Sequence, residues 1–327
     1  MEITAPKEWY VPLDILEKER GIAIIIGATD TGKSTLAKFV IFNLCQRGLK
    51  VALVDADIGQ SFLGPPTTMG LSLFKSDPDW KLLLSLPEIF FVGSITPEGY
   101  FPIHLKGVKR MVDKAVSMAA DLILVDTTGL VLGDTGRELK TRKIDLVSPR
   151  FILAIQKSEE LEPILEHYNE SPLLRIFRLP LSEQVRPRSM EERRIYRDDR
   201  FREYFKNSSI LEFAIEEVRI EGEVRDPNGD TLPLDWALRI SGLLIGLKDS
   251  NGETLALGVI RNYIEEKKVV RVLTPLGETE KVKTIHLSSL KVIPLYEESR
   301  ALMTLQVVDC ENFTGGNFFL YKSLFFF

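Results

Sequence analysis

The sequence predicts an α/β fold, in which a mostly parallel sheet is flanked by helices, followed by a β-rich C-terminal domain. Three observations support this prediction. Apolar runs alternate with helical stretches through the N-terminal part, and a glycine-rich loop separates the first run from the first helical stretch. After Asn207 the pattern changes to short alternating runs with turn dipeptides between them. Repeated strand–helix–strand units are typical of a parallel sheet, whereas short strands joined by Gly-containing turns are typical of a β-rich domain.

The first elements follow in order along the chain. Residues 1–20 are predicted to form a short helical lead-in. Residues 21–26 (GIAIII) are a continuous apolar run, which suits a central parallel strand that is buried on both faces. A helix is predicted over 33–47, because apolar residues recur at helical spacing and Gly48 follows as a stop signal. Residues 51–54 (VALV) predict the second buried strand.

The same alternation continues toward the second domain. A helix is predicted over about 106–120, and further strands over 89–92, 122–125, 151–155 and 174–177. Proline and charged residues cluster over 179–202, which marks the connection between the domains. We therefore divide the chain into a lead-in (1–20), a first domain (21–207) and a β-rich domain (208–327). The Phe-rich tail, 318–327, is predicted to be a last strand that packs on the β-rich domain.

The composition excludes several classes of protein. Hydrophobic residues make up 44% and charged residues 27%, which excludes a disordered or collagen-like chain. The 42 basic and 47 acidic residues give a net charge of −5, so an anionic partner must be held by a local basic patch. The two cysteines cannot build a disulfide framework or a multi-cysteine zinc site.

No membrane-spanning segment and no signal peptide are predicted. The longest purely aliphatic stretch, residues 22–26, is far too short to cross a bilayer. We expect a soluble, cytoplasmic protein with no membrane partner. Asn (8 residues) and Gln (5 residues) are scarce, which is typical of a heat-adapted, thermophilic source.

Residues 27–34 (GATDTGKS) match G-x-x-x-x-G-K-[ST], the sequence of a phosphate-binding P-loop, and lie between a predicted strand and a predicted helix as the motif requires. Backbone N–H groups of such a loop surround phosphate oxygens, and the helix that follows adds its positive N-terminal end. Lys33 is predicted to reach the β- and γ-phosphates, and Ser34 to bind Mg²⁺. The first domain is therefore predicted to be a P-loop NTPase. Its nucleotide-binding residues are predicted to be Gly27, Ala28, Thr29, Asp30, Thr31, Gly32, Lys33, Ser34 and Thr35.

Carboxylates follow two of the predicted strands directly. Asp55 and Asp57 come after the second strand, and Asp126 ends the run LILV. Ligands of an open α/β sheet bind beyond the carboxyl ends of its strands, so these side chains are predicted to face the nucleotide. Residues two apart on extended chain point the same way, so Asp55 and Asp57 can share one Mg²⁺ and one nucleophile. Asp126 has the Walker B position, and the sequence leaves open which carboxylate lies nearer the metal.

These motifs resemble those of the P-loop polynucleotide 5′-hydroxyl kinases, a family that includes the kinase subunit of the eukaryotic mRNA cleavage factor, the nucleolar rRNA-processing kinase and archaeal relatives. The matching segments, in family order, are the Walker A loop 27–34, the D-x-D-x-G-Q element 55–60 (DADIGQ), the clasp 93–97 (GSITP), the segment 126–133 (DTTGLVLG) and an arginine-bearing lid over 188–205. The D-x-D-x-G-Q element is unusual among P-loop proteins. The segment 241–247 is also similar to the family's terminal domain.

The resemblance implies a role for each matching residue. Lys33 contacts the phosphates, Ser34 binds Mg²⁺, and Asp57 is the general base on the 5′-OH. The other implied site residues are Asp55 and Gln60 beside the metal and the substrate end, Thr96 and Pro97 along the acceptor strand, Arg188 and Arg193 over the transferring phosphoryl group, and Thr127 and Arg197 on the substrate side.

The sequence departs from the family pattern at two positions. Asp126 replaces the usual Asn, which favours a carboxylate on the metal side, so that the predicted metal ligands are Ser34, Asp55, Asp57 and Asp126. Leu130 stands where a Trp is common, which bears on the preference for substrate more than on the chemistry. Base stacking on such a platform contributes roughly 1–3 kcal/mol per base.

The lid region is basic in an otherwise acidic chain. Between Arg175 and Lys206 there are ten basic and six acidic residues. A charge run is commonly a solvated helix face, but arginines brought to a P-loop by a mobile element neutralise the transferring phosphoryl group. The remaining arginines can contact nucleic-acid phosphates without reading sequence.

Together these features predict a Mg²⁺-dependent kinase that transfers the γ-phosphate of ATP or GTP to the 5′-OH end of RNA, with DNA as a further acceptor, in RNA processing or repair. Its expected partners are RNA ends and other RNA-processing proteins. Three alternatives stay open: a nucleotide-binding scaffold of RNA processing with little kinase activity, a switch-type NTPase that acts on a protein, and a small-molecule kinase.

Overall fold

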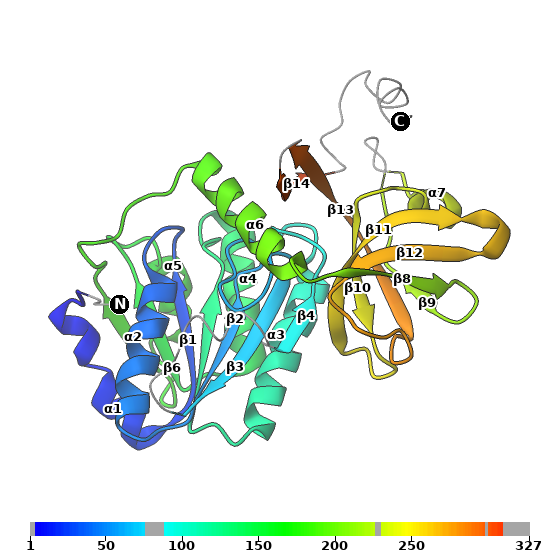
Figure 1. Cartoon of the computed structure of the whole chain (residues 1–327). Helices are drawn as coiled ribbons and strands as arrows, with labels where there is room; N and C mark the ends of the chain where they lie inside the picture. The colour runs from blue at the N-terminus through cyan, green and yellow to red at the C-terminus, as the bar shows by residue number, and fades with distance from the viewer. Residues whose placement is uncertain (1–3, 76–87, 226–229, 298–299, 310–327) are drawn as a thin grey trace. The chain divides into compact units, whose positions relative to one another are not determined.

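The computed structural model describes residues 4–75, 88–225, 230–297 and 300–309, with side chains described up to Val292. The predicted last strand over 318–327 lies outside the described residues. The chain divides into two compact units, Met1–Tyr204 and Phe205–Phe327. Figure 1 shows both units and the labels of their helices and strands.

The first unit contains a parallel sheet with an antiparallel extension. Its strand order is β4-β3-β2-β5-β1-β6-β7. The parallel strands are β1 (Gly21–Gly27), β2 (Val51–Ala56), β5 (Leu122–Thr127), β6 (Phe151–Ile155) and β7 (Arg175–Leu179), and the antiparallel strands are β3 (Thr68–Phe74) and β4 (Glu88–Phe91). Every residue of β2, β5 and β6 is buried, as the continuous apolar runs predict for strands that are covered on both faces.

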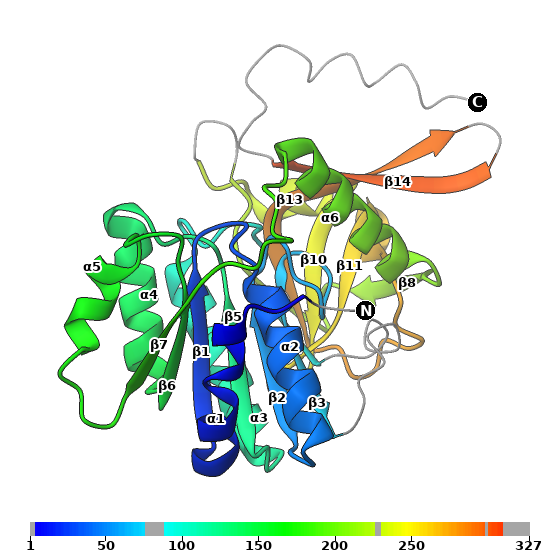
Figure 2. The same cartoon turned by 90° about the vertical axis from the view of Figure 1, so that its left-hand side faces the viewer.

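Helices cover both faces of this sheet. The helices are α1 (Leu13–Glu19), α2 (Lys33–Gln46), α3 (Phe101–Ser117), α4 (Gly133–Val147), α5 (Glu162–Leu165) and α6 (Met190–Phe205), with short 3₁₀ segments at Lys7–Tyr10 and Glu166–Tyr168. Figure 2 shows α1 and α2 in front of the strands, with α3 behind them.

The two faces have separate hydrophobic cores because successive strand residues point to opposite sides. Ala23, Ile25 and Leu124 pack with α1 and α2 on one face, whereas Ile24 and Val125 pack with α3, α4 and α5 on the other. The N-terminal lead-in belongs to the first core, where the Trp9 side chain is fully buried and its indole N–H donates to the backbone oxygen of Pro180 at 2.8 Å.

The second unit is mostly antiparallel. Its strands run in the order β14-β13-β10-β11-β12-β8, and β9 pairs in parallel with β13. These strands are β8 (Ser209–Ala214), β9 (Arg219–Glu221), β10 (Leu243–Lys248), β11 (Thr254–Ile264), β12 (Val269–Thr274), β13 (Thr284–Glu297) and β14 (Arg300–Asp309), accompanied by α7 (Leu234–Leu238) and a 3₁₀ segment at Glu265–Lys267. A separate core that includes Phe213, Leu243 and Val272 stabilises this unit.

The predicted α/β class, with a parallel core sheet and a β-rich C-terminal part, is confirmed. Strand β3, helix α4 and the short helix α5 were not predicted from the sequence. No helix in the described part of the chain has both the length and the apolar content needed to cross a bilayer.

Helix α3 approaches the sheet closely at Gly107. A Cβ atom there would lie 2.7 Å from Cδ1 of Phe90 and 2.9 Å from Sδ of Met69. We expect Gly107→Ala to lower the free energy of unfolding by about 1–3 kcal/mol, because the added methyl group overpacks this contact. Urea unfolding of both proteins measures the difference.

Lys106→Ala on the exposed side of the same helix is the matched control, and it should stay within about 0.5 kcal/mol of the wild type. Equal stabilities of G107A and the wild type would contradict the packing described for α3.

Candidate active site

The P-loop joins β1 to α2 and has the tight geometry that its sequence predicts. Gly32 has φ +89°, a left-handed conformation that favours glycine, and a Cβ there would lie 2.9 Å from Val185. The Thr31 hydroxyl donates to the oxygen of Ala28 at 2.9 Å. The loop therefore forms a closed turn that ends at the N-terminus of α2, where backbone N–H groups can surround an anion.

Lys33 lies in the centre of the site. Its ammonium donates to the oxygen of Ala28 at 2.7 Å, and the side chain is buried. Burial lowers the pKa of Lys33, while Asp126, Asp57 and Asp30 act in the opposite direction. A phosphate group would stabilise the ammonium further, since it brings negative charge into a poorly solvated place.

Ser34 and Asp126 form the part of the site that fits a metal ion. The Ser34 hydroxyl donates to Oδ2 of Asp126 at 2.5 Å, and the other carboxylate oxygen, Oδ1, is buried without a hydrogen-bond partner among the described residues. Burial, then the nearby Asp55, raise the pKa of Asp126 to about 7, and Lys33 opposes this rise. A hydroxyl beside a buried carboxylate with an unused oxygen fits Mg²⁺, which in such sites is held by one or two carboxylates and by substrate phosphates.

The other carboxylates of this region have different surroundings. Asp55 is fully buried and holds its own loop: Oδ2 accepts from the Ser61 hydroxyl at 2.9 Å and from the N–H groups of Phe62 at 2.7 Å and Leu63 at 3.1 Å. Burial, together with Asp57, raises the pKa of Asp55 to about 6. The role of Asp55 as a metal ligand stays a prediction. Its hydrogen bonds fix the conformation of residues 55–64.

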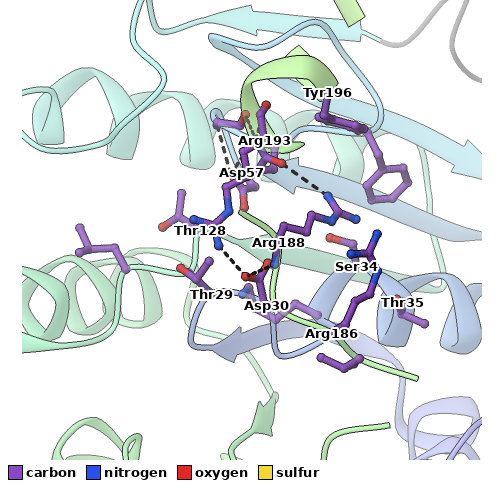
Figure 3. A pocket seen from close by; sticks show the side chains of 18 of the residues that line it. Thr29, Asp30, Ser34, Thr35, Asp57, Thr128, Arg186, Arg188, Arg193 and Tyr196 are labelled. Carbon is purple, nitrogen blue, oxygen red and sulfur yellow. Dashed lines mark hydrogen bonds and ion pairs between the residues drawn. The ribbon is translucent and has the colours of Figure 1, made fainter. Parts of the chain in front are cut away.

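Asp57 lines the cavity. Its Oδ1 accepts from the N–H groups of Gly59 at 3.1 Å and Gln60 at 3.0 Å, which fixes the orientation of the carboxylate. These bonds turn the chain after β2, so that the carboxylate lies near the P-loop (Figure 3). A positioned carboxylate in this place can accept a proton from a hydroxyl group that attacks a phosphate.

Residues of the predicted clasp contact the 55–64 loop. A Cβ on Gly59 would lie 2.6 Å from the oxygen of Ile95, so the two segments abut. The Ser94 hydroxyl donates to the oxygen of Thr96 at 2.7 Å, and Thr96 and Pro97 both line the cavity. The clasp therefore forms one wall beside Asp57.

The lid contacts the P-loop through Asp30. Oδ2 of Asp30 accepts from the Arg188 N–H at 3.0 Å and from the Arg193 guanidinium at 2.5 Å (Figure 3). The Tyr196 hydroxyl donates to the oxygen of Ser61 at 2.8 Å, which joins α6 to the loop after β2. The arginines thus lie at the mouth of the phosphate-binding loop.

These segments surround one cavity of about 780 Å³ within the first unit. The predicted site residues that line it are Thr29, Asp30, Gly32, Lys33, Ser34, Thr35, Asp57, Gln60, Thr96, Pro97, Arg188, Arg193 and Arg197. The remaining predicted residues, Gly27, Ala28, Thr31, Asp55, Asp126 and Thr127, lie behind this lining, and their roles stay predictions. Thr127 is fully buried and donates to the oxygen of Ile25 at 2.8 Å, whereas Thr128 lines the cavity.

Sequence reasoning missed two groups of residues. Lys38, Phe62 and Tyr196 also line the cavity, and the spacing of Lys38 four residues after Ser34 was the available signal.

Lys140 and Lys143 are fully buried on α4. The Lys140 ammonium donates to the hydroxyl of Thr127 at 3.0 Å and to the oxygen of Thr128 at 2.5 Å, so it fixes the segment after β5. A pair of lysines on the apolar side of α4 was the signal for this arrangement.

No group of three or more His, Cys, Asp and Glu side chains suited to a metal ion occurs among the described residues. The predicted metal ligands Ser34, Asp55, Asp57 and Asp126 therefore stay a prediction.

Comparison with known proteins gives consistent results. Residues 27–207 match the family described as mRNA cleavage and polyadenylation factor CLP1 P-loop. A polyribonucleotide 5′-hydroxyl-kinase of Pyrococcus furiosus is 32% identical over 86% of this chain and 91% of its own, and one of Methanocaldococcus jannaschii is 30% identical over 80% and 83%. The chain is also similar to the solved Clp1p of a Clp1p–Pcf11p complex, with a TM-score of 0.70 and 14% identity over 89% of this chain and 80% of that one, which shows a shared fold.

The buried carboxylate of Asp126 predicts a pH-dependent stability. Because its pKa is raised to about 7 in the folded protein, the folded state holds the proton more tightly than the unfolded state does. Stability from this group is complete below about pH 4 and is lost as the pH rises through 7. We therefore expect the free energy of unfolding of the wild type, relative to Asp126→Asn, to fall between pH 5 and pH 8.

Denaturant unfolding without divalent cations measures this difference at each pH. The neutral amide keeps the size of the side chain and does not titrate, so the comparison removes the contributions of the groups that Asp126 does not influence. A difference that is constant or grows with pH would contradict the surroundings described for Asp126.

Proposed function

The chain belongs to the CLP1 P-loop family, and from this premise we propose that it is a polyribonucleotide 5′-hydroxyl kinase that moves the γ-phosphoryl group of ATP to the 5′-OH end of RNA. The family and the kinase activity were both predicted from the sequence. One observation supports the proposal most strongly: a phosphate-binding loop and the carboxylate of Asp57 line the same cavity.

The donor side of the cavity is the P-loop. Its backbone N–H groups and the N-terminus of α2 hold the phosphates, and Lys33 moves from the oxygen of Ala28 to the β- and γ-phosphates. Ser34 and Asp126 would hold Mg²⁺, which neutralises charge on the phosphates when it is bound. The P-loop itself does not distinguish ATP from GTP.

The acceptor side is the 55–64 loop together with the clasp. Asp57 accepts the proton of the 5′-OH, whose oxygen then attacks the γ-phosphorus in line, and the bond from that phosphorus to the β–γ bridging oxygen breaks. The loop N–H bonds to Oδ1 hold the carboxylate in one orientation. Gln60, Thr96 and Pro97 line the path of the strand.

The lid supplies positive charge to the transferring group. Arg193 is held by Asp30 at the mouth of the P-loop, and Arg188 and Arg197 also line the cavity. Guanidinium groups in this position stabilise the charge that spreads over the phosphoryl oxygens in the transition state. Burial lowers the pKa of Arg197, because its guanidinium is poorly solvated. A phosphate group that binds there would compensate for this lost solvation.

The walls of the cavity offer phosphate-binding groups, which supports recognition of a strand end whatever its sequence. RNA is the acceptor we propose, with DNA ends accepted by the same groups.

Incubation with 5′-OH RNA and DNA oligonucleotides of one sequence and γ-labelled ATP tests the proposal. Label on the oligonucleotide is expected, and its absence where nucleotide binds would favour a scaffold. Hydrolysis stimulated by a protein and not by an oligonucleotide would favour a switch-type NTPase.

We expect Asp57→Asn to lower the rate of phosphate transfer by about 10²–10⁴-fold while the KM for ATP changes little. The amide cannot accept the proton of the 5′-OH, yet it can still accept the N–H bonds of the loop. Single-turnover transfer to a 5′-OH oligonucleotide measures this rate.

Asp113→Asn, at an exposed carboxylate on α3, is the matched control and should transfer phosphate as the wild type does. A D57N protein with full transfer activity would remove Asp57 from the role of general base.

A further inference from the structure

Lys38 is a cation of the cavity wall for which the donor nucleotide has no evident use. It follows Ser34 by four residues, so both side chains lie on the same face of α2. Long side chains of a helix point back toward its N-terminus, which directs the Lys38 ammonium toward the cavity that Lys38 lines. The P-loop N–H groups and Lys33 already surround the position of the triphosphate.

The aromatic ring of Phe62 lies beneath this ammonium. Nζ of Lys38 is 4.5 Å from the centroid of the ring, which is the geometry of a cation–π contact. Phe62 is itself held firmly: its N–H donates to Asp55 at 2.7 Å, its oxygen accepts from Arg200 at 3.1 Å, and its side chain packs partly on the hydrophobic core. The ammonium therefore has a fixed support at the edge of the 55–64 loop.

Lys38 is a poorly solvated cation in the cavity wall. Burial lowers its pKa, the carboxylates Asp55 and Asp126 oppose this effect, and the cations Arg188 and Arg200 lower the pKa further. A phosphate group that enters the cavity would bring negative charge to this ammonium, which already lines the wall in a place with little solvent.

The position of Lys38 identifies which phosphate this is. Its support, Phe62, belongs to the same loop as Asp57, the proposed base, and Gln60, so Lys38 lies on the acceptor side. With the 5′ oxygen at Asp57, a strand that follows this loop would bring its first phosphodiester toward Lys38. We propose that Lys38, held over the Phe62 ring in the wall of this cavity, binds the first internucleotide phosphate of the acceptor strand.

This inference rests on the proposed function and adds a substrate requirement to it. The enzyme would recognise a 5′ end by the phosphate on the 3′ side of the first nucleoside, independently of the base. A nucleoside that carries a 3′-phosphate would then bind in the acceptor site, whereas the same nucleoside without that phosphate would bind poorly.

The test compares Lys38→Met and Lys38→Arg with the wild type. Loss of one charged phosphate contact should raise the Kd and the KM for a 5′-OH oligonucleotide about 10-fold or more in K38M, with an unchanged KM for ATP. The slope of log K against log salt for the single strand should fall by about 0.7 in magnitude. K38R, which keeps the charge, should retain most of the affinity.

Lys109→Met is the matched control for a change of net charge, because Lys109 is exposed on α3 and pairs with Asp113. It should change neither the Kd nor the slope.

A substrate-side measurement does not depend on how well K38M folds. A neutral methylphosphonate at the first linkage should weaken binding to the wild type by about the same factor as K38M does, and should weaken binding to K38M little further. The same replacement at a distant linkage is the control. If K38M and the first-linkage methylphosphonate each raise the Kd by a separate factor, and the two factors multiply when both changes are present, the proposal is overturned. A K38M protein that loses affinity for ATP alone would also overturn it.

These binding measurements separate the inference from the kinase activity. A wild type that binds the oligonucleotide but transfers no phosphate would contradict the proposed function, while the methylphosphonate comparison would still decide whether Lys38 holds the first phosphate. An unchanged Kd and salt slope in K38M would assign Lys38 to packing against Phe62.

Discussion

The register between β2 and β5 is the constraint on which the site depends. It places Asp55 and Asp126 beside one another as paired residues of neighbouring parallel strands, and both side chains are fully buried. Two carboxylates this close in a poorly solvated place are costly unless other groups compensate for their charge. That compensation comes from polar groups around them. Asp55 accepts from the Ser61 hydroxyl and from the N–H groups of Phe62 and Leu63, and Ser34 and Lys33 lie beside Asp126.

The same hydrogen bonds also shape the candidate site. Asp55 uses its oxygens to shape the loop that carries Asp57, and Asp126 receives the Ser34 hydroxyl at the start of α2. Lys140 on α4 fixes the segment after β5 through its hydrogen bonds to Thr127 and Thr128. A further buried ammonium, Lys143, is influenced electrostatically by Asp57 and Asp126, and its pKa is lowered to about 7 by burial. The stability of this region and the geometry of the candidate site therefore depend on the same buried charges.

Much of this site could be predicted because it depends on local sequence. The P-loop is recognised from the local spacing of its glycines, and the carboxyl ends of adjacent parallel strands meet at one edge of the sheet. The proximity of Lys33, Asp57 and Asp126 could therefore be predicted from the sequence pattern alone. Other features depend on packing between distant segments. The bond from Arg193 to Asp30 and the contact of Lys38 with Phe62 join residues whose proximity no local spacing reveals. Strand β3 was missed because Gly70 interrupts its apolar run.

We propose that one cavity holds both the phosphate donor and the 5′ end of a polynucleotide. A crystal structure of the protein with Mg²⁺, a non-hydrolysable ATP analogue and a short 5′-OH RNA tests it most directly. The account predicts the 5′ oxygen within about 2.6–3.2 Å of an Asp57 carboxylate oxygen, in line with the γ-phosphorus held at Lys33. A strand whose end lies outside the cavity, or an Asp57 carboxylate turned away from the triphosphate, would contradict it.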